Sequence, residues 1–494
     1  MLRAILIVLC MMCCWVANAQ QHNQQQIQKL NQLYSYLRSN YVDEVDLEPL
    51  VEEAIRATIS ELDPHSLYLT QEEMANMRSH IRGAFAGVGI RYIQHNDTIV
   101  VRSTIPHSPA ASADIRPNDR ITAVEGRSII GITTDSLATL LRGDVNTKVE
   151  IAITRRGEPN TLRIRLQRDI IENNAISSAF RIGDTGYIAV SHFSKPVAAE
   201  FLAAYRGLGD MKSLIVDLRD NGGGAISSAI DLTGLFLKRG DVILSTEGRS
   251  YNAVYDKKRD GALCDIPLVV LINENSASAS EIFAGAIQDH DRGVIVGRRS
   301  YGKGLIQRVV EFKDKSGLCI TIARYKTPSG RIIQRPYCMG EAEEYRRDSM
   351  RYKEPDRSSL DTLPRFKTLN SERVVYGGGG IMPDIYIQAD SLRHDRPITQ
   401  HDVEHAVVAL YDRMSAEELR MLYPTPEEYA ECFTLDVELS DEALAIIKAQ
   451  IAEEIYGAGA YYHIYGHNHD EALRRATEIA SSTNEMQRIL QGDK

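Results

Sequence analysis

Three serines alternate with alanines in residues 276–280, and a lysine between two glycines follows at Lys303. A serine hydroxyl can attack a carbonyl carbon once a neighbouring base removes its proton. Lysine is normally protonated and cannot accept that proton, but burial in an apolar site lowers the pKa of its amine. These residues therefore predict a hydrolase with a serine nucleophile and a lysine base.

The serines follow an apolar run, Pro267–Ile272, which is typical of a strand buried on both faces. Residues 276–288 continue with apolar residues at helical spacing. A serine at the start of that helix lies beside unpaired backbone N–H groups, which favour an oxyanion. The pattern does not choose among Ser276, Ser278 and Ser280. The competing interpretation makes Ser276 a helix N-cap and the other two small packing residues.

Lys303 lies between a short apolar strand, residues 294–297, and a strand-like pattern, residues 305–312. If the second strand starts near Lys303, the side chains of Lys303 and Gln307 project from the same face. The Gln307 amide can then orient the amine without adding charge. A solvent-exposed turn lysine is the alternative interpretation.

A second strand-to-turn motif, Ser213–Gly224, ends in three consecutive glycines. Glycine adopts positive φ readily, so such a loop can present bare N–H groups to a ligand. The alternative is a turn that caps a helix over residues 225–237. For Asp217, Arg219 and Asp220, beside this loop, we expect structural ion pairs or surface contacts.

Together these segments resemble the carboxyl-terminal processing peptidases, which are tail-specific serine proteases with a PDZ domain. The resemblance is carried by Ser276–Asp289, Val296–Gly297, Tyr301–Gly304 and Gln307. It implies that Ser278 is the nucleophile, that Lys303 is the general base and that Gln307 orients Lys303.

The resemblance also implies an oxyanion hole. One donor is the backbone N–H of Gly223, with Gly222 as the alternative, and the other is the N–H of Ala279. Further segments extend the match, namely Gly186–Ser194, Ile320–Arg331 and Gly380–Asp384.

Residues 83–168 resemble a PDZ domain. Short strands are expected over residues 89–92, 98–103, 120–124, 148–155 and 161–166, with a helix over 135–142. The carboxylate-binding loop implied by the resemblance holds the peptide-binding residues Phe85, Gly87, Val88, Gly89 and Ile90. Its N–H groups hold the terminal carboxylate of a peptide, and the next strand pairs with the peptide. A small β-rich domain with a glycine turn is the alternative.

Two details of this segment matter for its peptide site and its backbone. Leu137, Leu140 and Leu141 are expected to form the floor of an apolar side-chain pocket. Asp114 and Asn118 replace residues usual in the family, where a left-handed backbone is needed. Asparagine tolerates that conformation, whereas Asp114 adopts it at a cost.

The alternation of apolar runs and helical patterns between residues 186 and 310 indicates an α/β sheet. The predicted fold is mixed α+β, with a PDZ domain inserted between an N-terminal helical region and an α/β Ser/Lys protease core, followed by a helical C-terminal extension. The predicted boundaries are a signal peptide over 1–19, the helical region over 20–82, the PDZ domain over 83–168, the core over 169–395 and the extension over 396–494.

The first nineteen residues have the physical features of a signal peptide. Arg3 supplies the charge, Ala4–Val16 the apolar stretch and Ala17–Ala19 the cleavage site. This predicts secretion across the inner membrane into the periplasm, with peripheral membrane association as a variant. Four cysteines lie outside the segment, and both disulfides and free thiols are compatible with their spacing: Cys264, Cys319, Cys338 and Cys432.

The net charge of −10 excludes nucleic acid as an expected partner. No HExxH or paired CxxC motif suggests a metal, and no cofactor is expected. The expected partners are the C-termini of proteins or peptides, and a second copy of the chain through the N- or C-terminal helical regions. None of the histidines, His65, His192 and His290 included, stands in a recognisable triad motif.

The resulting functional hypothesis is a secreted serine endopeptidase that captures a protein's C-terminal tail and cleaves near it through an acyl-enzyme. The alternative from a different class is a non-catalytic PDZ scaffold on a protease-like core. A non-peptide acyl hydrolase shares the chemistry but gives the PDZ segment no natural role.

Overall fold

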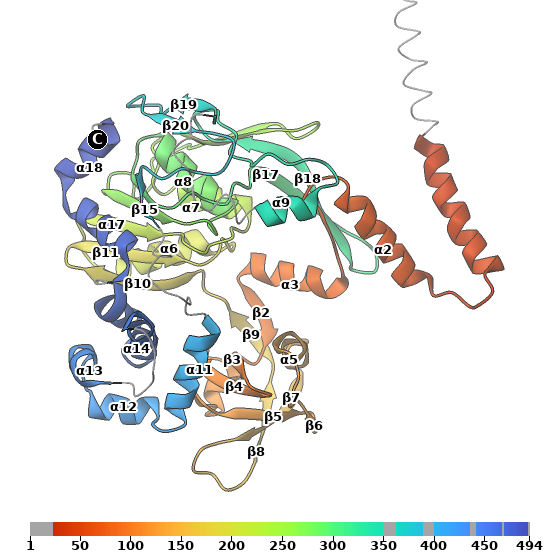
Figure 1. The fold of residues 1–494 in the computed structure, drawn as a ribbon, viewed down its shortest axis with the longest axis horizontal. Helices are drawn as coiled ribbons and strands as arrows, with labels where there is room; N and C mark the ends of the chain where they lie inside the picture. Colours follow the sequence, from red (N-terminus) through yellow and green to blue (C-terminus); the bar gives the residue numbers. More distant parts are fainter. Residues whose placement is uncertain (1–22, 349–361, 389–399, 435–440, 467–468, 493–494) are drawn as a thin grey trace, which may run out of the picture.

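The computed structural model describes residues 23–348, 362–388, 400–434, 441–466 and 469–492. An α/β core and a smaller β domain lie at opposite ends of the molecule (Figure 1). The C-terminal helices run along one side and reach both parts. The signal-peptide prediction lies outside the described residues.

The core is built on a six-stranded sheet in the order β10-β11-β12-β15-β16-β21. β10 is antiparallel to β11, and the other strands are parallel. Since β12 and β15 pair in parallel, the loops after both strands leave the same edge of the sheet. The bounds are β10 Ile176–Ile182, β11 Thr185–Val190, β12 Ser213–Asp217, β15 Leu268–Ile272, β16 Val294–Gly297 and β21 Ile385–Tyr386.

Both faces of this sheet are covered, as the continuous apolar run of β15 requires. Leu268, Val270 and Ile272 pack into the cluster that includes helices α6, α7 and α8. Val269 and Leu271 point the other way, into a cluster with α17 and α18. The C-terminal extension therefore supplies one whole layer of the core (Figure 1). The bounds are α6 Val197–Gly207, α7 Ile226–Thr233, α8 Ala279–Asp289, α17 Glu471–Ser481 and α18 Thr483–Gln491.

A second sheet carries the segment after Lys303. The long strand β18 pairs with β17 along one edge and with β1 and β13 along the other, and β14 extends β13. β1 comes from the N-terminal region, so it brings residues 63–66 against this sheet. The bounds are β1 Leu67–Leu69, β13 Val242–Glu247, β14 Ala253–Asp256, β17 Leu305–Glu311 and β18 Gly317–Lys326.

The small β domain has the strand order β3-β4-β5-β7-β8, with β6 beside β5, so β3 is an edge strand. A separate two-stranded ladder of β2 and β9 joins the domain to the core. Asp114 has φ 57° and Asn118 has φ 68°, as the sequence pattern required. The bounds are β2 Ala84–Gly87, β3 Ile90–His95, β4 Thr98–Thr104, α4 Pro109–Ser112, β5 Arg120–Val124, β6 Arg127–Ser128, α5 Thr134–Leu141, β7 Lys148–Thr154, β8 Leu162–Gln167 and β9 Asp169–Glu172.

The remaining C-terminal helices form a bundle that contacts the small β domain. Val408 packs on Ile93 and Val100. Asp412 accepts two hydrogen bonds from Arg120, each at 2.8 Å. The bounds are α11 Gln400–Tyr411, α12 Ala416–Leu422, α13 Pro426–Cys432, α14 Asp441–Tyr456, α15 Ala458–Tyr461 and the π-helical turn η2 Tyr462–Gly466.

The N-terminal region is helical, and its first helix, residues 23–40, extends away from the body (Figure 1). Several of its apolar side chains are exposed, namely Ile27, Leu30, Leu33 and Tyr36, the last by 70%. The other elements are α2 Leu47–Ser60, α3 Gln71–Arg82, α9 Ala342–Asp348, β19 Arg365–Lys367 and β20 Val374–Tyr376. Within the described residues, no helix combines the length and apolarity needed to cross a membrane. The four cysteines outside the first nineteen residues are free thiols.

Candidate active site

The structure separates the three serines that the sequence left equivalent. The Ser276 hydroxyl donates to Leu218 O at 2.7 Å, and the Ser280 hydroxyl donates to Asn221 O at 2.8 Å. Both side chains are fully buried. Ser278 is half-buried and is the N-cap of α8, with φ 56° and ψ −108°. Only Ser278 of the three therefore combines access with a strained backbone, as nucleophile turns often do.

The helix begins at Ala279, three residues later than the predicted start at Ser276. Long-range contacts explain the difference, because Ser276 and Ser280 are bound to the loop after β12 rather than to a helix turn. In the first turn of α8, the N–H of Ser280 donates to Ala277 O at 3.1 Å and that of Glu281 to Ser278 O at 3.0 Å, whereas no acceptor for the Ala279 N–H is found among the described residues.

Glu281 holds the nucleophile and the lysine segments together. Its Oε2 accepts from Ser278 N and Lys303 N, both at 2.8 Å. Its Oε1 accepts from Ser300 Oγ at 2.6 Å and Gly302 N at 2.7 Å. Burial raises the pKa of Glu281, against the effect of these donors. We did not predict this role, although the spacing Ser-x-x-Glu is a capping-box signal.

Lys303 and Gln307 meet as predicted by their spacing. Lys303 Nζ donates to Gln307 Oε1 at 2.9 Å. The Gln307 amide in turn donates to the backbone carbonyl of His65. Burial lowers the pKa of Lys303, while the nearby Glu281 and Asp63 carboxylates act in the opposite direction. β17 starts only at Leu305, so the contact does not require Lys303 to lie in the strand.

The N-terminal turn that carries His65 is fixed by Asp63. The Asp63 carboxylate accepts from the N–H groups of His65 and Ser66, both at 2.9 Å, and from Thr321 on β18 at 3.2 Å. The His65 ring contacts the Tyr345 hydroxyl at 3.1 Å. Burial, and to a lesser extent the charge of Lys303, lowers the pKa of His65 to about 4, so the ring is neutral. The turn thus positions Gln307 through a backbone carbonyl.

The other two candidate histidines have partners of their own. His290 Nε2 lies 2.7 Å from Val242 O. The His192 ring lies against the His80 ring, with centroids 4.6 Å apart.

Gly223 lies directly against Ser278, the predicted nucleophile. Its φ is 101°, and a Cβ at this position would stand 2.9 Å from Ser278 Cβ and 3.0 Å from Ala279 N. This contact brings the predicted oxyanion donors together. The Gly223 N–H donates to Asn221 Oδ1 at 2.9 Å, so this donor is occupied.

Asn221 was not predicted and joins three segments. Its side-chain amide donates to Val190 O at 2.7 Å. Its backbone carbonyl oxygen accepts from Ala277 N at 3.0 Å and from the Ser280 hydroxyl. The side chain is fully buried. The glycine loop and the nucleophile loop are consequently locked in register.

The side chains predicted to be nucleophile and base, Ser278 and Lys303, are not hydrogen-bonded to each other. Across the described residues, no hydrogen bond joins Ser278 Oγ to Lys303 Nζ. The same residues contain no group of three or more His, Cys, Asp or Glu side chains able to hold a metal ion.

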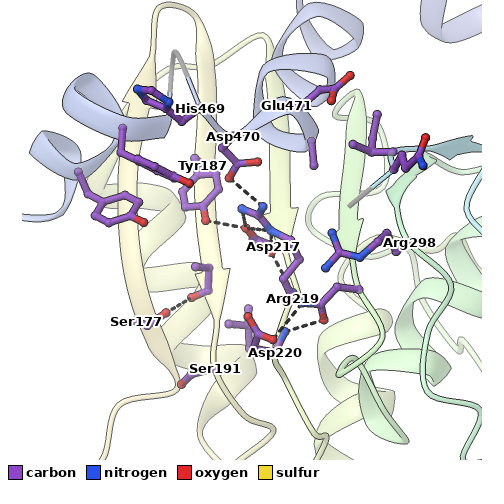
Figure 2. A pocket seen from close by; sticks show the side chains of 18 residues that line it. Ser177, Tyr187, Ser191, Asp217, Arg219, Asp220, Arg298, His469, Asp470 and Glu471 are labelled. Carbon is purple, nitrogen blue, oxygen red and sulfur yellow. Dashed lines mark hydrogen bonds and ion pairs between the residues drawn. The ribbon is translucent and has the colours of Figure 1, made fainter. Parts of the chain in front are cut away.

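A cavity of about 600 Å³ lies beside these loops, at the carboxyl ends of β11, β12 and β15 (Figure 2). Tyr461, Tyr465 and residues 469–472 of the C-terminal extension line one side of it, and neither Ser278 nor Lys303 lines it. In it Arg219 pairs with Asp217 at 2.6 Å and with Asp470 at 2.7 Å. Arg219 therefore braces the base of the glycine loop against the extension, as expected of a structural ion pair.

The residues expected to bind a peptide carboxylate lie at the join between the small β domain and the core. Phe85 and Gly87 belong to β2 and pair with β9. Val88 and Gly89 form the turn that follows, and Ile90 begins β3. A Cβ at Gly89 would stand 2.2 Å from Ser108 Cβ, so only glycine fits there.

The three leucines expected to form an apolar floor differ in burial. Leu137 and Leu141 are buried in the core of the small domain. Leu140, in contrast, is 37% exposed.

Comparison with known proteins shows that three regions of the chain match protein families. A sequence model of peptidase family S41 matches residues 184–338, one of the PDZ domain matches residues 100–155, and one of the activating protease CtpB N-terminal domain matches residues 15–73. The carboxy-terminal-processing protease of Bartonella bacilliformis is 36% identical over 326 residues, 64% of this chain and 74% of the relative. A probable CtpA-like serine protease of Staphylococcus aureus is 31% identical over 355 residues, 70% of this chain and 68% of the relative.

Among solved structures, the photosystem II D1 C-terminal processing protease is 26% identical, with a TM-score of 0.38. The alignment covers 74% of this chain and 87% of that one. The PDZ domain of a Vibrio cholerae carboxy-terminal protease, solved with a peptide, is 26% identical. It covers 18% of this chain and 98% of its own, with a TM-score of 0.17.

Proposed function

Because this chain belongs to the carboxy-terminal-processing proteases of peptidase family S41 and carries a PDZ domain, we propose that it is a secreted serine endopeptidase that cleaves proteins near their C-terminal tails. The proposal depends most on the contacts of the Glu281 carboxylate. One of its oxygens, Oε2, accepts hydrogen bonds from the backbone N–H groups of both Ser278 and Lys303. A shared ligand of this kind fixes nucleophile and base relative to each other.

In the proposed reaction, neutral Lys303 removes the proton from the Ser278 hydroxyl, and the alkoxide attacks the scissile carbonyl carbon. The N–H groups of Gly223 and Ala279 stabilise the oxyanion. Lys303 then gives the proton to the leaving amine, which leaves an acyl-enzyme on Ser278. A water molecule, deprotonated by Lys303, hydrolyses the ester and frees the serine.

Two rearrangements accompany peptide binding in this proposal. The Gly223 N–H leaves Asn221 Oδ1, its acceptor in this structure, and turns to the substrate oxygen. The side chains of Ser278 and Lys303 also come into hydrogen-bond contact. The second change starts from backbones that already share Glu281.

The PDZ domain captures the substrate. Among the described residues β3 pairs with β4 only, so its other edge can pair with an extended peptide, and the turn at Val88–Gly89 presents N–H groups to the terminal carboxylate of that peptide. Residues 1–19 direct the chain across the inner membrane into the periplasm. The exposed apolar side chains of the helix over residues 23–40 support assembly of two copies through the N-terminal regions.

Purified Ser278→Ala and Lys303→Ala variants test the chemistry. The substrate is an unstructured protein with an apolar C-terminus, and the products are sized by mass spectrometry. Both variants should lose cleavage, whereas Lys315→Ala, a lysine paired with Glu311 on the same hairpin, should retain it. Full activity of either active-site variant would refute the assignment.

A further inference from the structure

Tyr325 lies on β18 with its side chain only 1% exposed. Its hydroxyl group stands 3.3 Å from Ser278 O and 3.2 Å from Lys303 O, within hydrogen-bond distance of both. A phenol has one proton to donate, so the two carbonyl oxygens share it. The backbone N–H of Tyr325 also donates to Gly304 O at 3.0 Å. One residue thus reaches the backbone of the nucleophile and of the base.

The proposed nucleophile and base therefore have two partners in common. Glu281 Oε2 binds the N–H groups of Ser278 and Lys303 from one side. The Tyr325 hydroxyl binds the carbonyl groups of the same two residues from the other. Each of the two residues is consequently held through both its N–H and its carbonyl group, and neither residue can shift without disturbing a ligand of the other.

The two carbonyl groups differ in how much they depend on Tyr325. Ser278 O also accepts from the N–H groups of Glu281 and Ile282, both at 3.0 Å, as the first turns of α8 require. For Lys303 O, the Tyr325 hydroxyl is the hydrogen-bond donor found among the described residues. Loss of the hydroxyl should therefore release Lys303 more than Ser278.

The hydroxyl is a dependable donor. Burial, together with the Glu281 carboxylate, raises the pKa of Tyr325 well above its ordinary value. The phenol therefore keeps its proton beyond the pH at which an ordinary tyrosine loses it.

We propose that Tyr325 is a positioning residue, whose hydroxyl keeps the Lys303 backbone aligned with Ser278 so that the amine reaches the serine oxygen. This inference rests on the proposed Ser278–Lys303 chemistry. Tyr325 itself touches neither the substrate nor a transferred proton. A misalignment of about 1 Å can lower a rate by roughly 100-fold, so one buried hydroxyl is enough to matter.

The test replaces only the hydroxyl, with Tyr325→Phe. Tyr68→Phe is the matched control, because Tyr68 is buried in the same sheet and its hydroxyl donates to Glu52 at 3.0 Å. The readouts are kcat and KM on an unstructured fluorogenic peptide with an apolar C-terminus, the rate of Ser278 labelling by a fluorophosphonate, and the thermal midpoint.

We expect Tyr325→Phe to lower kcat and the labelling rate by about 10- to 100-fold, with KM unchanged and a thermal midpoint close to that of Tyr68→Phe. A kcat within two-fold of wild type would overturn the inference. A kcat loss explained by the unfolded fraction, or matched by Tyr68→Phe, would overturn it as well.

The same assays separate this inference from the proposed function. If wild type cleaves no better than Ser278→Ala, the proposed function fails. If wild type is active and Tyr325→Phe equals it, only the positioning role of Tyr325 fails.

Discussion

Replacing Gly223 with alanine tests the contact between the glycine loop and the nucleophile. Gly223 has φ 101°, and a Cβ there would stand 2.8 Å from Ala277 O, 2.9 Å from Ser278 Cβ and 3.0 Å from Ala279 N. Two of these neighbours are backbone atoms, so the strain cannot be relieved by turning a side chain. Accommodation of the methyl group has to move Gly223 or the nucleophile turn.

The size of the effect follows from three contributions. A left-handed backbone costs an alanine about 1–2 kcal/mol. Overpacking adds about 1–3 kcal/mol. The lower entropy of the unfolded chain returns roughly 0.4–1 kcal/mol. We therefore expect Gly223→Ala to lower the free energy of unfolding by about 1–5 kcal/mol and kcat by roughly 100-fold, since Ser278 and Ala279 are displaced.

Two other glycines provide controls. Gly240 has φ 92° but no atom within 4 Å of its Cβ position, so Gly240→Ala isolates the backbone strain. Gly222 has neither a positive φ nor a close neighbour, so Gly222→Ala should leave stability and kcat nearly unchanged. The measurements are urea unfolding and peptide cleavage. Wild-type kcat in Gly223→Ala, or a loss of kcat in Gly222→Ala as large as in Gly223→Ala, would refute the reasoning.

Four further predictions concern the base and the C-terminal extension. Burial lowers the pKa of Lys303, so kcat/KM should rise with pH as its amine loses the proton, with a midpoint below that of free lysine; a flat pH profile would contradict this. Lys303→Met should abolish activity yet raise the free energy of unfolding near neutral pH. The reason is that the lysine binds a proton more tightly in the unfolded chain than in its buried site, which destabilises the folded wild type. Urea unfolding should show this gain in the variant fading as pH rises towards the ordinary pKa of lysine. Asp470→Asn keeps the helix cap but loses the negative charge that faces Arg219. We therefore expect urea unfolding to show a free energy of unfolding lower by about 1.5 kcal/mol, together with a lower kcat. Wild-type values of both quantities would show that the ion pair between Arg219 and Asp470 is dispensable. Asp412→Asn should weaken the interaction of Arg120 with the residue that follows α11 by at most about 1 kcal/mol. Hydrogen exchange would detect this as faster exchange in β5, and unchanged exchange would contradict it.

Much of the candidate site could be predicted because its residues follow local rules. The strand before Ser278, the helix after it and the spacing of Lys303 and Gln307 are local patterns, and the structure places the two side chains in contact. The choice among the three serines depended on the family resemblance. Its structural reason is distant in sequence, since Ser276 and Ser280 are bound to residues 218–221.

Other features depend on contacts that no local pattern contains. The Gln307 amide is held by the carbonyl of His65, 242 positions earlier in the chain. In the sequence Asn221 looks like an ordinary turn residue, although its side-chain oxygen accepts the hydrogen bond from the Gly223 N–H. The apolar run of β15 implies a cover on both faces of the sheet, but nothing local identifies α17 as the second cover.

The most direct test of the central claim is the site and rate of covalent labelling by a fluorophosphonate, followed by intact-mass analysis and peptide mapping. We predict one phosphonyl group per chain, located on Ser278, absent in Ser278→Ala and formed at least 100-fold more slowly in Lys303→Ala, because the serine then lacks its base. Labelling at Ser276 or Ser280 instead, or an equal rate in Lys303→Ala, would contradict the assignment of Ser278 and Lys303 as nucleophile and base.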